Sequence, residues 1–287
     1  MKKQYDRSIY TVYTPESQLQ SPLTLLRSMW HDLKASRELA WRLTVRDINA
    51  RYRQSILGVL WAFLPPLATA GTFIFLNSEG IVNVGTTKIP YVAFALFGTV
   101  LWQFFAECIT TPLKVVTTNK LMLAHINFPR EALILSAIGQ VLFNFCMRLV
   151  ILVAVFVIFH LQPTWGLLLA PLAILMLMLL GILIGIILTP IGMLYADVKE
   201  GIALILPLGL LLTPVVYTTP EQGILAVLAK INPLSPILMA ARDLATVGTM
   251  TGLISFLIIS GITILGLLVM WVVYRVSIPI LTERIGA

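Results

Sequence analysis

Charged residues are scarce in this sequence. Asp, Glu, Lys and Arg together make up only 11% of the 287 residues, while 58% are hydrophobic. A typical soluble domain has about 25% charged residues. Apolar runs close to the roughly 18 residues that cross the hydrocarbon core of a bilayer recur along most of the chain. The composition therefore excludes an ordinary soluble domain and predicts an all-α membrane protein.

Cysteine is almost absent too, since the chain has only two. Cys108 lies near the end of one apolar run and Cys146 near the middle of another. Helical rise separates their depths by roughly 12 Å, whereas a disulfide needs Cα atoms within about 7 Å of each other. We expect two buried free thiols.

Motifs of catalysis are missing. The sequence contains no G-x-x-x-x-G-K-[ST] phosphate loop, so any nucleotide hydrolysis has to occur on another subunit. Glu107 is the only acid in the apolar runs and the three histidines are scattered, which argues against a membrane-embedded glycan-processing enzyme, because such an enzyme needs convergent acids or histidines. An ion channel or secondary transporter would show inverted repeats, and we see none. We expect no enzymatic activity, no catalytic residue, no cofactor and no metal site.

Six apolar stretches are candidate transmembrane helices: residues 56–77, 89–111, 132–159, 167–194, 202–217 and 253–274. The fifth is short and contains Pro207 and Pro214, so we expect it to be kinked or to cross incompletely. Residues 221–248, before the sixth, are semi-polar and are interrupted by an asparagine and two prolines. This pattern predicts two short re-entrant helices that dip into one leaflet.

Lys and Arg are distributed unevenly between the two sides that these spans define. Sixteen of the 20 lie before the first span, in the connections after the second and fourth spans, or after the sixth. The other side has only Lys88, Lys230 and Arg242. By the positive-inside rule both termini are cytoplasmic, and we expect a location in the cell inner (plasma) membrane. This topology accounts for the net charge of +7 without a nucleic-acid partner. We divide the chain into a cytoplasmic N-terminal region, residues 1–55, and a transmembrane domain, residues 56–287.

The N-terminal region has the pattern of an amphipathic interface helix. A Ser-Pro pair suits its start, and residues 39–52 place apolar side chains at i, i+4 spacing opposite basic ones. Such a helix lies along the cytoplasmic membrane surface. We expect Glu38 to pair with Arg42, and Asp47 with Arg51. The basic cluster is either a topology anchor on membrane lipid or a docking surface for a cytoplasmic partner. Its residues are Arg42, Arg46, Asp47, Arg51, Tyr52 and Arg53.

A polar stripe follows the third predicted span. It consists of Ser136, Gln140, Asn144 and Arg148, which recur every four residues and so share one helix face. Because an arginine at the bilayer centre costs at least ~2.5 to 3.5 kcal/mol, this face has to meet another helix or a hydrated channel, and both alternatives stay open. Helical rise places Glu107 level with Gln140, so we expect these two to pair. It places Arg148 roughly 13 Å farther outward, where a different partner is needed.

Two further features of the spans concern packing and the channel. Gly181 and Gly185 form a G-x-x-x-G face that lets two helices approach closely, either within one subunit or between two copies. Tyr195 and Tyr217, near opposite ends of the fourth and fifth spans, are candidate channel aromatics, because sugars stack on aromatic faces. The alternative is that they are interfacial aromatics, which membrane helices carry in any case.

Four stretches resemble one family. RDINARYRQSILGVLWAFLPPL (residues 46–67) is similar to the signature that opens the first span of ABC-2-type permeases, the membrane subunits of O-antigen, capsule and teichoic acid exporters. The other three are NKLMLAHINFPREALILSAIG, TPVVYTTP and INPLSPILMAARD, at residues 119–139, 213–220 and 231–243, in the family's order. The sequence departs from the family's motifs at two places. Pro65 stands where the family often has a polar residue before the proline, and two threonines separate Tyr217 from the next proline. These departures concern the local geometry of the gate and not the resemblance as a whole.

The resemblance implies a function and partners. It implies the permease of an ATP-driven exporter of a lipid-linked polysaccharide, O-antigen first and capsule or teichoic acid as alternatives. It also implies a homodimer that binds two copies of a cytoplasmic ATPase. A short helix too apolar for a free loop is predicted at residues 120–126, and the resemblance makes it the coupling helix that inserts into the ATPase, with the 197–200 turn as a second contact. The alternative is that it rests on lipid headgroups. The residues concerned are Asn119, Lys120, Leu121, Met122, Leu123, His125, Asp197, Lys199 and Glu200.

Overall fold

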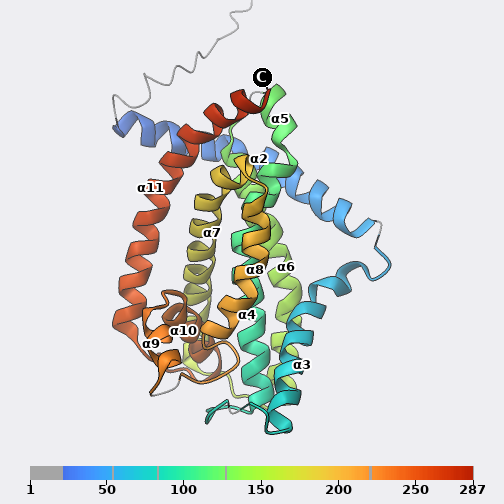
Figure 1. Cartoon of the computed structure of the whole chain (residues 1–287), viewed down its shortest axis with the longest axis vertical. Helices are drawn as coiled ribbons and strands as arrows, with labels where there is room; N and C mark the ends of the chain where they lie inside the picture. Colours follow the sequence, from blue (N-terminus) through green and yellow to red (C-terminus); the bar gives the residue numbers. More distant parts are fainter. Residues whose placement is uncertain (1–21, 54, 83, 127, 220–221, 287) are drawn as a thin grey trace, which may run out of the picture.

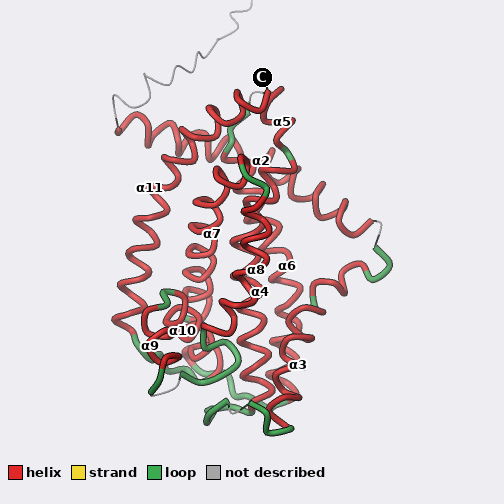
Figure 2. Tube along the Cα trace, in the orientation of Figure 1, coloured by secondary structure: helices red, strands yellow, loops and turns green. Residues whose placement is uncertain are grey.

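A bundle of long helices forms the body of the protein, and one further long helix crosses one end of it (Figure 1). The computed structural model describes residues 22–286 except 54, 83, 127, 220 and 221. In these residues every regular element is a helix, as Figure 2 shows. The elements are α2 (Pro22–Arg53), η1 (Gly58–Ala62), α3 (Leu64–Ser78), α4 (Tyr91–Thr118), α5 (Lys120–His125), α6 (Glu131–Ile158), η2 (Trp165–Leu168), α7 (Ala170–Leu194), α8 (Asp197–Leu212), α9 (Ile224–Ile231), α10 (Leu234–Thr246) and α11 (Leu253–Gly286).

Four of the described helices are long and apolar enough to cross a membrane: α4, α6, α7 and the part of α11 up to Ile278. The chain is thus a multi-pass membrane protein. The predicted first span, residues 56–77, is not one continuous α-helix, because residues 58–62 form a 3-10 helix and α3 begins only at Leu64. Pro65 and Pro66 occupy the first turn of α3, where the missing N–H costs no hydrogen bond. α3 and α8 have 15 and 16 residues, and their crossing of the membrane stays a prediction.

α4 is the central helix of the bundle. It packs against α7 and α6 along most of its length and against α3 near one end. Two glycines of α7 allow a close approach to α4, since a Cβ on Gly185 would lie 2.8 Å from the Ile109 carbonyl oxygen and one on Gly181 would lie 2.5 Å from the Cys108 Cβ. In this subunit the G-x-x-x-G face therefore packs against α4. Cys108 is buried there as expected, but the prediction for Cys146 is wrong, because it lies on the exposed face of α6.

α2 crosses the end of the bundle and packs against the first turns of α6 (Figure 1). Its buried face includes Ala40, Leu43 and Thr44, which follow the expected i, i+4 pattern. A Cβ on Gly139 of α6 would lie 2.7 Å from the Thr44 hydroxyl oxygen, so this glycine permits the crossing. The expected pair between Glu38 and Arg42 is present at 2.6 Å.

Two short helices, α9 and α10, occupy the segment before α11, at the end of the bundle opposite to α2 (Figure 1). The sequence predicts two such helices there. α10 packs against α7, α11 and η2, and most of its side chains are buried. Entry of these helices into one leaflet stays a prediction.

Candidate functional site

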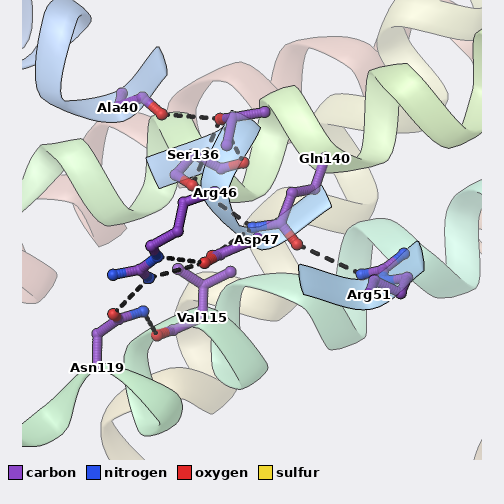
Figure 3. Close-up of polar contacts among 9 residues, drawn as sticks. Ala40, Arg46, Asp47, Arg51, Val115, Asn119, Ser136 and Gln140 are labelled. Atoms are coloured by element: carbon purple, nitrogen blue, oxygen red, sulfur yellow. Dashed lines mark hydrogen bonds and ion pairs between the residues drawn. The ribbon is translucent and has the colours of Figure 1, made fainter. Parts of the chain in front are cut away.

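The polar stripe of α6 faces α2 and α4. Near the end of α6 that α2 crosses, Gln140 donates from its Nε2 to Asp47 Oδ2 at 3.0 Å and accepts from Arg51 Nη2 at 3.4 Å (Figure 3). One turn earlier, the Thr44 hydroxyl lies 3.3 Å from the Ser136 carbonyl oxygen. The expected pair between Asp47 and Arg51 is therefore wrong, because both side chains turn to α6 and bind Gln140 instead of each other.

Asn144 continues the network one turn deeper. Its Oδ1 accepts from the Tyr52 hydroxyl at 3.3 Å and from Arg51 Nη1 at 3.5 Å. Its Nδ2 donates to Glu107 Oε2 at 3.0 Å. One amide thus joins the basic end of α2 to the only acid in the predicted spans.

Arg148 lies at the deep end of the stripe and is only 2% exposed. Its Nη2 forms an ion pair with Glu107 Oε1, and its Nε donates to the Ala62 carbonyl oxygen at 2.8 Å. The expected pairing of Glu107 with Gln140 is wrong, because Glu107 binds Asn144 and Arg148. Ala62 ends η1, so the network also fixes the connection between α2 and α3. We call the set of Asp47, Arg51, Tyr52, Glu107, Gln140, Asn144 and Arg148 the α2–α6 network.

Arg46 links α2 to the start of α5. Its guanidinium contacts Asp47 Oδ1 and donates from Nη2 to Asn119 Oδ1 at 2.8 Å (Figure 3). The Asn119 amide in turn donates to the Val115 carbonyl oxygen at 2.8 Å, which caps the last turn of α4. Asn119 separates α4 from α5, so α2 contacts this junction directly. Arg42 and Arg53 are exposed and lie outside these contacts.

α5 matches the short helix expected at residues 120–126 within one residue. Leu121 is 68% exposed, whereas Leu123 is 6% exposed and packs into the core. Lys120 and His125 are exposed and Met122 is partly buried. The outward face of α5 therefore consists of Lys120, Leu121 and His125, and Leu123 belongs to the interior.

The second predicted contact region lies at the same end of the bundle (Figure 1). Asp197, Lys199 and Glu200 are exposed, and they form the first turn of α8 rather than a free turn. Tyr195 is exposed just before them. Tyr217 lies toward the other end of α8, where its hydroxyl donates to the Leu211 carbonyl oxygen at 3.0 Å. The structure keeps the two tyrosines apart.

An ion-pair cluster near the same end was not anticipated from the sequence. Arg275 of α11 donates from Nη2 to Asp32 Oδ2 of α2 at 2.6 Å and from Nη1 to Glu131 Oε1 of α6 at 3.1 Å. These residues are far apart in the sequence and belong to no common motif, so no sequence signal was available to find them. The cluster ties the last helix to the first described one.

Two of the sequence motifs meet at the opposite end. Arg242 of α10 donates from Nη1 to the carbonyl oxygens of Pro214 and Val215, each at 3.1 Å, and its guanidinium carbon lies 3.7 Å from the centre of the Phe94 ring. Asn232 donates to the Thr213 hydroxyl at 2.8 Å. The conformation of residues 213–215 is thus fixed by side chains of the segment 231–243.

The arrangement is one of polar contacts between helices. In the described part of the chain, no three or more His, Cys, Asp and Glu side chains are grouped so that they could hold a metal ion. The α2–α6 network connects α2 with α4 and α6, and Arg46 and Asn119 extend these contacts to the start of α5. Such a network is suited to transmit a displacement of α2 or α5 into the bundle.

Comparison with known proteins identifies similar chains. Residues 38–246, from within α2 to the end of α10, match the family described as "ABC-2 type transporter". The chain is 26% identical over 207 residues to the "O-antigen export system permease protein RfbA" of Myxococcus xanthus, a match that covers 71% of this chain and 78% of the relative. It is 27% identical over 236 residues to a Klebsiella pneumoniae protein of the same name, with 78% of this chain and 88% of the relative covered.

Proposed function

The chain belongs to the ABC-2 type transporter family, and we propose that it is the permease subunit of an ATP-driven exporter that moves a lipid-linked polysaccharide of the O-antigen type across the inner membrane. The observation that carries this proposal is the similarity to relatives named as O-antigen export permeases over 71% and 78% of the chain. The absence of a phosphate loop from this sequence supports the part of the proposal that places ATP hydrolysis on a separate subunit.

We propose that the chain crosses the membrane six times, with both termini in the cytoplasm. α3 and α8 are the two additional crossings. Fifteen helical residues rise only about 22 Å, so η1 has to complete the first crossing, and residues 213–217 complete the fifth. The distribution of Lys and Arg supports this orientation, because α2 and α5 then lie on the side with sixteen of the 20 basic residues.

The ATPase contact is formed by the outward face of α5, with the first turn of α8 beside it. Leu121 is a large apolar side chain that is 68% exposed next to the exposed Lys120 and His125. A partner that buries the Leu121 side chain removes apolar surface from water, which stabilises the complex. Through Asn119 and Arg46 a movement of α5 reaches α2 and the α2–α6 network. Two ATPase copies then act on two copies of this chain.

The path for the glycan lies between two copies of the subunit. Exposed apolar side chains continue along α8, for example Leu204 and Leu208, and a second copy is one means of covering them. Tyr195 and Tyr217 lie at the two ends of this path, where their rings contact the sugar chain. Because the polar stripe of α6 is satisfied by α2 and α4 within one subunit, we assign it to force transmission rather than to the lining of the path.

The test of this function uses Leu121→Asp in cells that lack the native gene. We expect the wild-type chain to restore surface polysaccharide and to co-purify with an ATPase, and to hydrolyse no ATP by itself. Leu121→Asp should lose the ATPase and export while its abundance in the membrane stays normal, because the side chain is exposed. Ile81→Asp is the matched control, since Ile81 is 66% exposed in the loop after α3, at the other end of the bundle.

Two results would contradict the proposal. If cells that lack the chain still display the glycan, the chain is not its exporter. If Leu121→Asp retains the ATPase while a variant of the exposed residues of α2 loses it, α2 is the main docking surface and α5 rests on lipid.

A further inference from the structure

A groove opens between α2 and the first two turns of α6, with a volume of about 720 Å³. Lys34, Arg37 and Trp41 of α2 form one wall, and Leu135 and Gly139 of α6 form the other. The groove is distinct from the α2–α6 network, whose side chains start at Asp47. It is basic at its rim and apolar where it meets α6.

The rim carries positive charge that no carboxylate offsets. Glu38, the only acid of the groove, is paired with Arg42 at 2.6 Å. In the described part of the chain, neither Lys34 nor Arg37 forms an ion pair with Asp or Glu. The Lys34 ammonium lies over the Trp30 ring, 5.5 Å from its centre. Two unpaired cations beside an apolar wall fit a ligand with an anionic head and a hydrocarbon tail.

The surroundings of the groove match the boundary between headgroups and acyl chains. Trp30 and Trp41 are 58% and 68% exposed, and indole rings gather at this boundary because they are apolar with one polar N–H. Leu135 is continued along the same face of α6 by Leu142 and Leu149, both exposed. These residues repeat every seven positions and form an apolar track for a lipid tail.

From these observations we propose that the groove binds an anionic phospholipid, with its phosphate between Lys34 and Arg37 and one acyl chain on the track below Leu135. This goes beyond a general attraction of basic residues to the membrane, because it names one binding site and its ligand class. It is also independent of which molecule the protein exports. A bound lipid would hold the N-terminal half of α2 at a fixed height on the membrane.

The test is photocrosslinking in vesicles of phosphatidylcholine with a minority of phosphatidylglycerol, with the purified full chain. A photoreactive residue at Leu135 should crosslink phosphatidylglycerol in excess of its share of the vesicle. The same residue at Leu194, an exposed position at the end of α7, should report the bulk ratio. Equal ratios at both positions would overturn the proposal.

Charge variants identify the phosphate ligands. Lys34→Gln and Arg37→Gln should each lower the enrichment at Leu135 about fivefold, the factor that one basic residue at an anionic surface contributes. Arg53→Gln, which removes the same charge from the far end of α2, should leave it unchanged. An enrichment that persists in the Lys34 and Arg37 variants would refute the site.

The same vesicles distinguish a phospholipid from the lipid-linked glycan as the source of the bound phosphate, because they contain no lipid-linked glycan. Enrichment in them is expected and requires a phospholipid ligand. If enrichment at Leu135 appears only in membranes that contain the lipid-linked glycan, the groove binds that molecule and our assignment is wrong.

Discussion

Arg148 stands at the deep end of the α2–α6 network, 2% exposed. An arginine at the membrane centre costs at least ~2.5 to 3.5 kcal/mol when it faces lipid. Here the ion pair with Glu107 and the hydrogen bond to the Ala62 carbonyl oxygen offset that cost. Asn144 holds the second oxygen of the same carboxylate, so the charge on Glu107 is shared between two residues of α6.

Arg148→Ala is expected to lower the free energy of unfolding by about 3 to 5 kcal/mol, because it leaves Glu107 without its partner in a buried site. Thermal or denaturant unfolding in detergent measures this change. The double variant Arg148→Met with Glu107→Gln removes both charges and should be more stable than the sum of the two single changes implies. Strict additivity would show that the two side chains do not interact.

The sequence predicts the members of the stripe but not their partners. Four polar residues at a spacing of four define one face of α6 without further information. The sequence predicts a shallow position for Glu107 because the apolar run of the second span ends at residue 111, whereas α4 continues to Thr118. The seven additional residues of α4 correspond to about 10 Å of helical rise. They account for most of the depth difference of roughly 13 Å that the sequence predicts between Glu107 and Arg148.

At the scale of elements, close helix contacts depend on glycine. Gly185 of α7 lies so near the α4 backbone that a Cβ would be 2.8 and 2.9 Å from the carbonyl oxygens of Ile109 and Cys108. Backbone atoms of a central helix cannot move aside as the tip of a side chain can. The G-x-x-x-G pattern predicts a close contact, but the identity of the partner helix requires the structure, because every span offers an apolar face.

We expect Gly185→Ala to destabilise the bundle by about 1 to 3 kcal/mol, the usual cost of overpacking. Gly71→Ala is the matched control, since Gly71 lies within α3 and a Cβ there meets nothing within 4 Å. The control should be neutral or stabilising by about 0.5 to 1 kcal/mol, because alanine is the better helix former. The melting temperatures of the two variants measure this difference. Equal changes in melting temperature for Gly185→Ala and Gly71→Ala would contradict the close contact of α7 with α4.

In the whole molecule, the segments that loop charge assigns to opposite sides of the membrane lie at opposite ends of the bundle. α2, α5 and the first turn of α8 lie at one end of the bundle, and α9, α10 and the α3–α4 connection lie at the other (Figure 1). The sequence predicts this separation because loop charges are visible without coordinates. It does not predict that Arg242, counted on the other side, is 3% exposed and binds backbone oxygens inside the protein.

Cysteine labelling tests the orientation in a background with Cys108→Ala and Cys146→Ala. Glu79→Cys, in the turn after α3, should react with an impermeant thiol reagent in intact spheroplasts. Lys120→Cys, at the start of α5, should react only after the membrane is opened. Both positions are exposed, so a difference reports sidedness. The reverse result would invert the topology.

The ion pair between Asp32 and Arg275 joins residues 243 positions apart, and this separation has a consequence for biosynthesis. Of the described helices α2 leaves the ribosome first, yet its partner on α11 is made only after all the others. Until then α2 is held by its contacts with α6, η1 and Asn119, and Asp32 lacks its partner Arg275. A chain interrupted before Arg275 would contain every described helix that precedes α11 and would still lack the ion pairs that join α11 to α2 and α6.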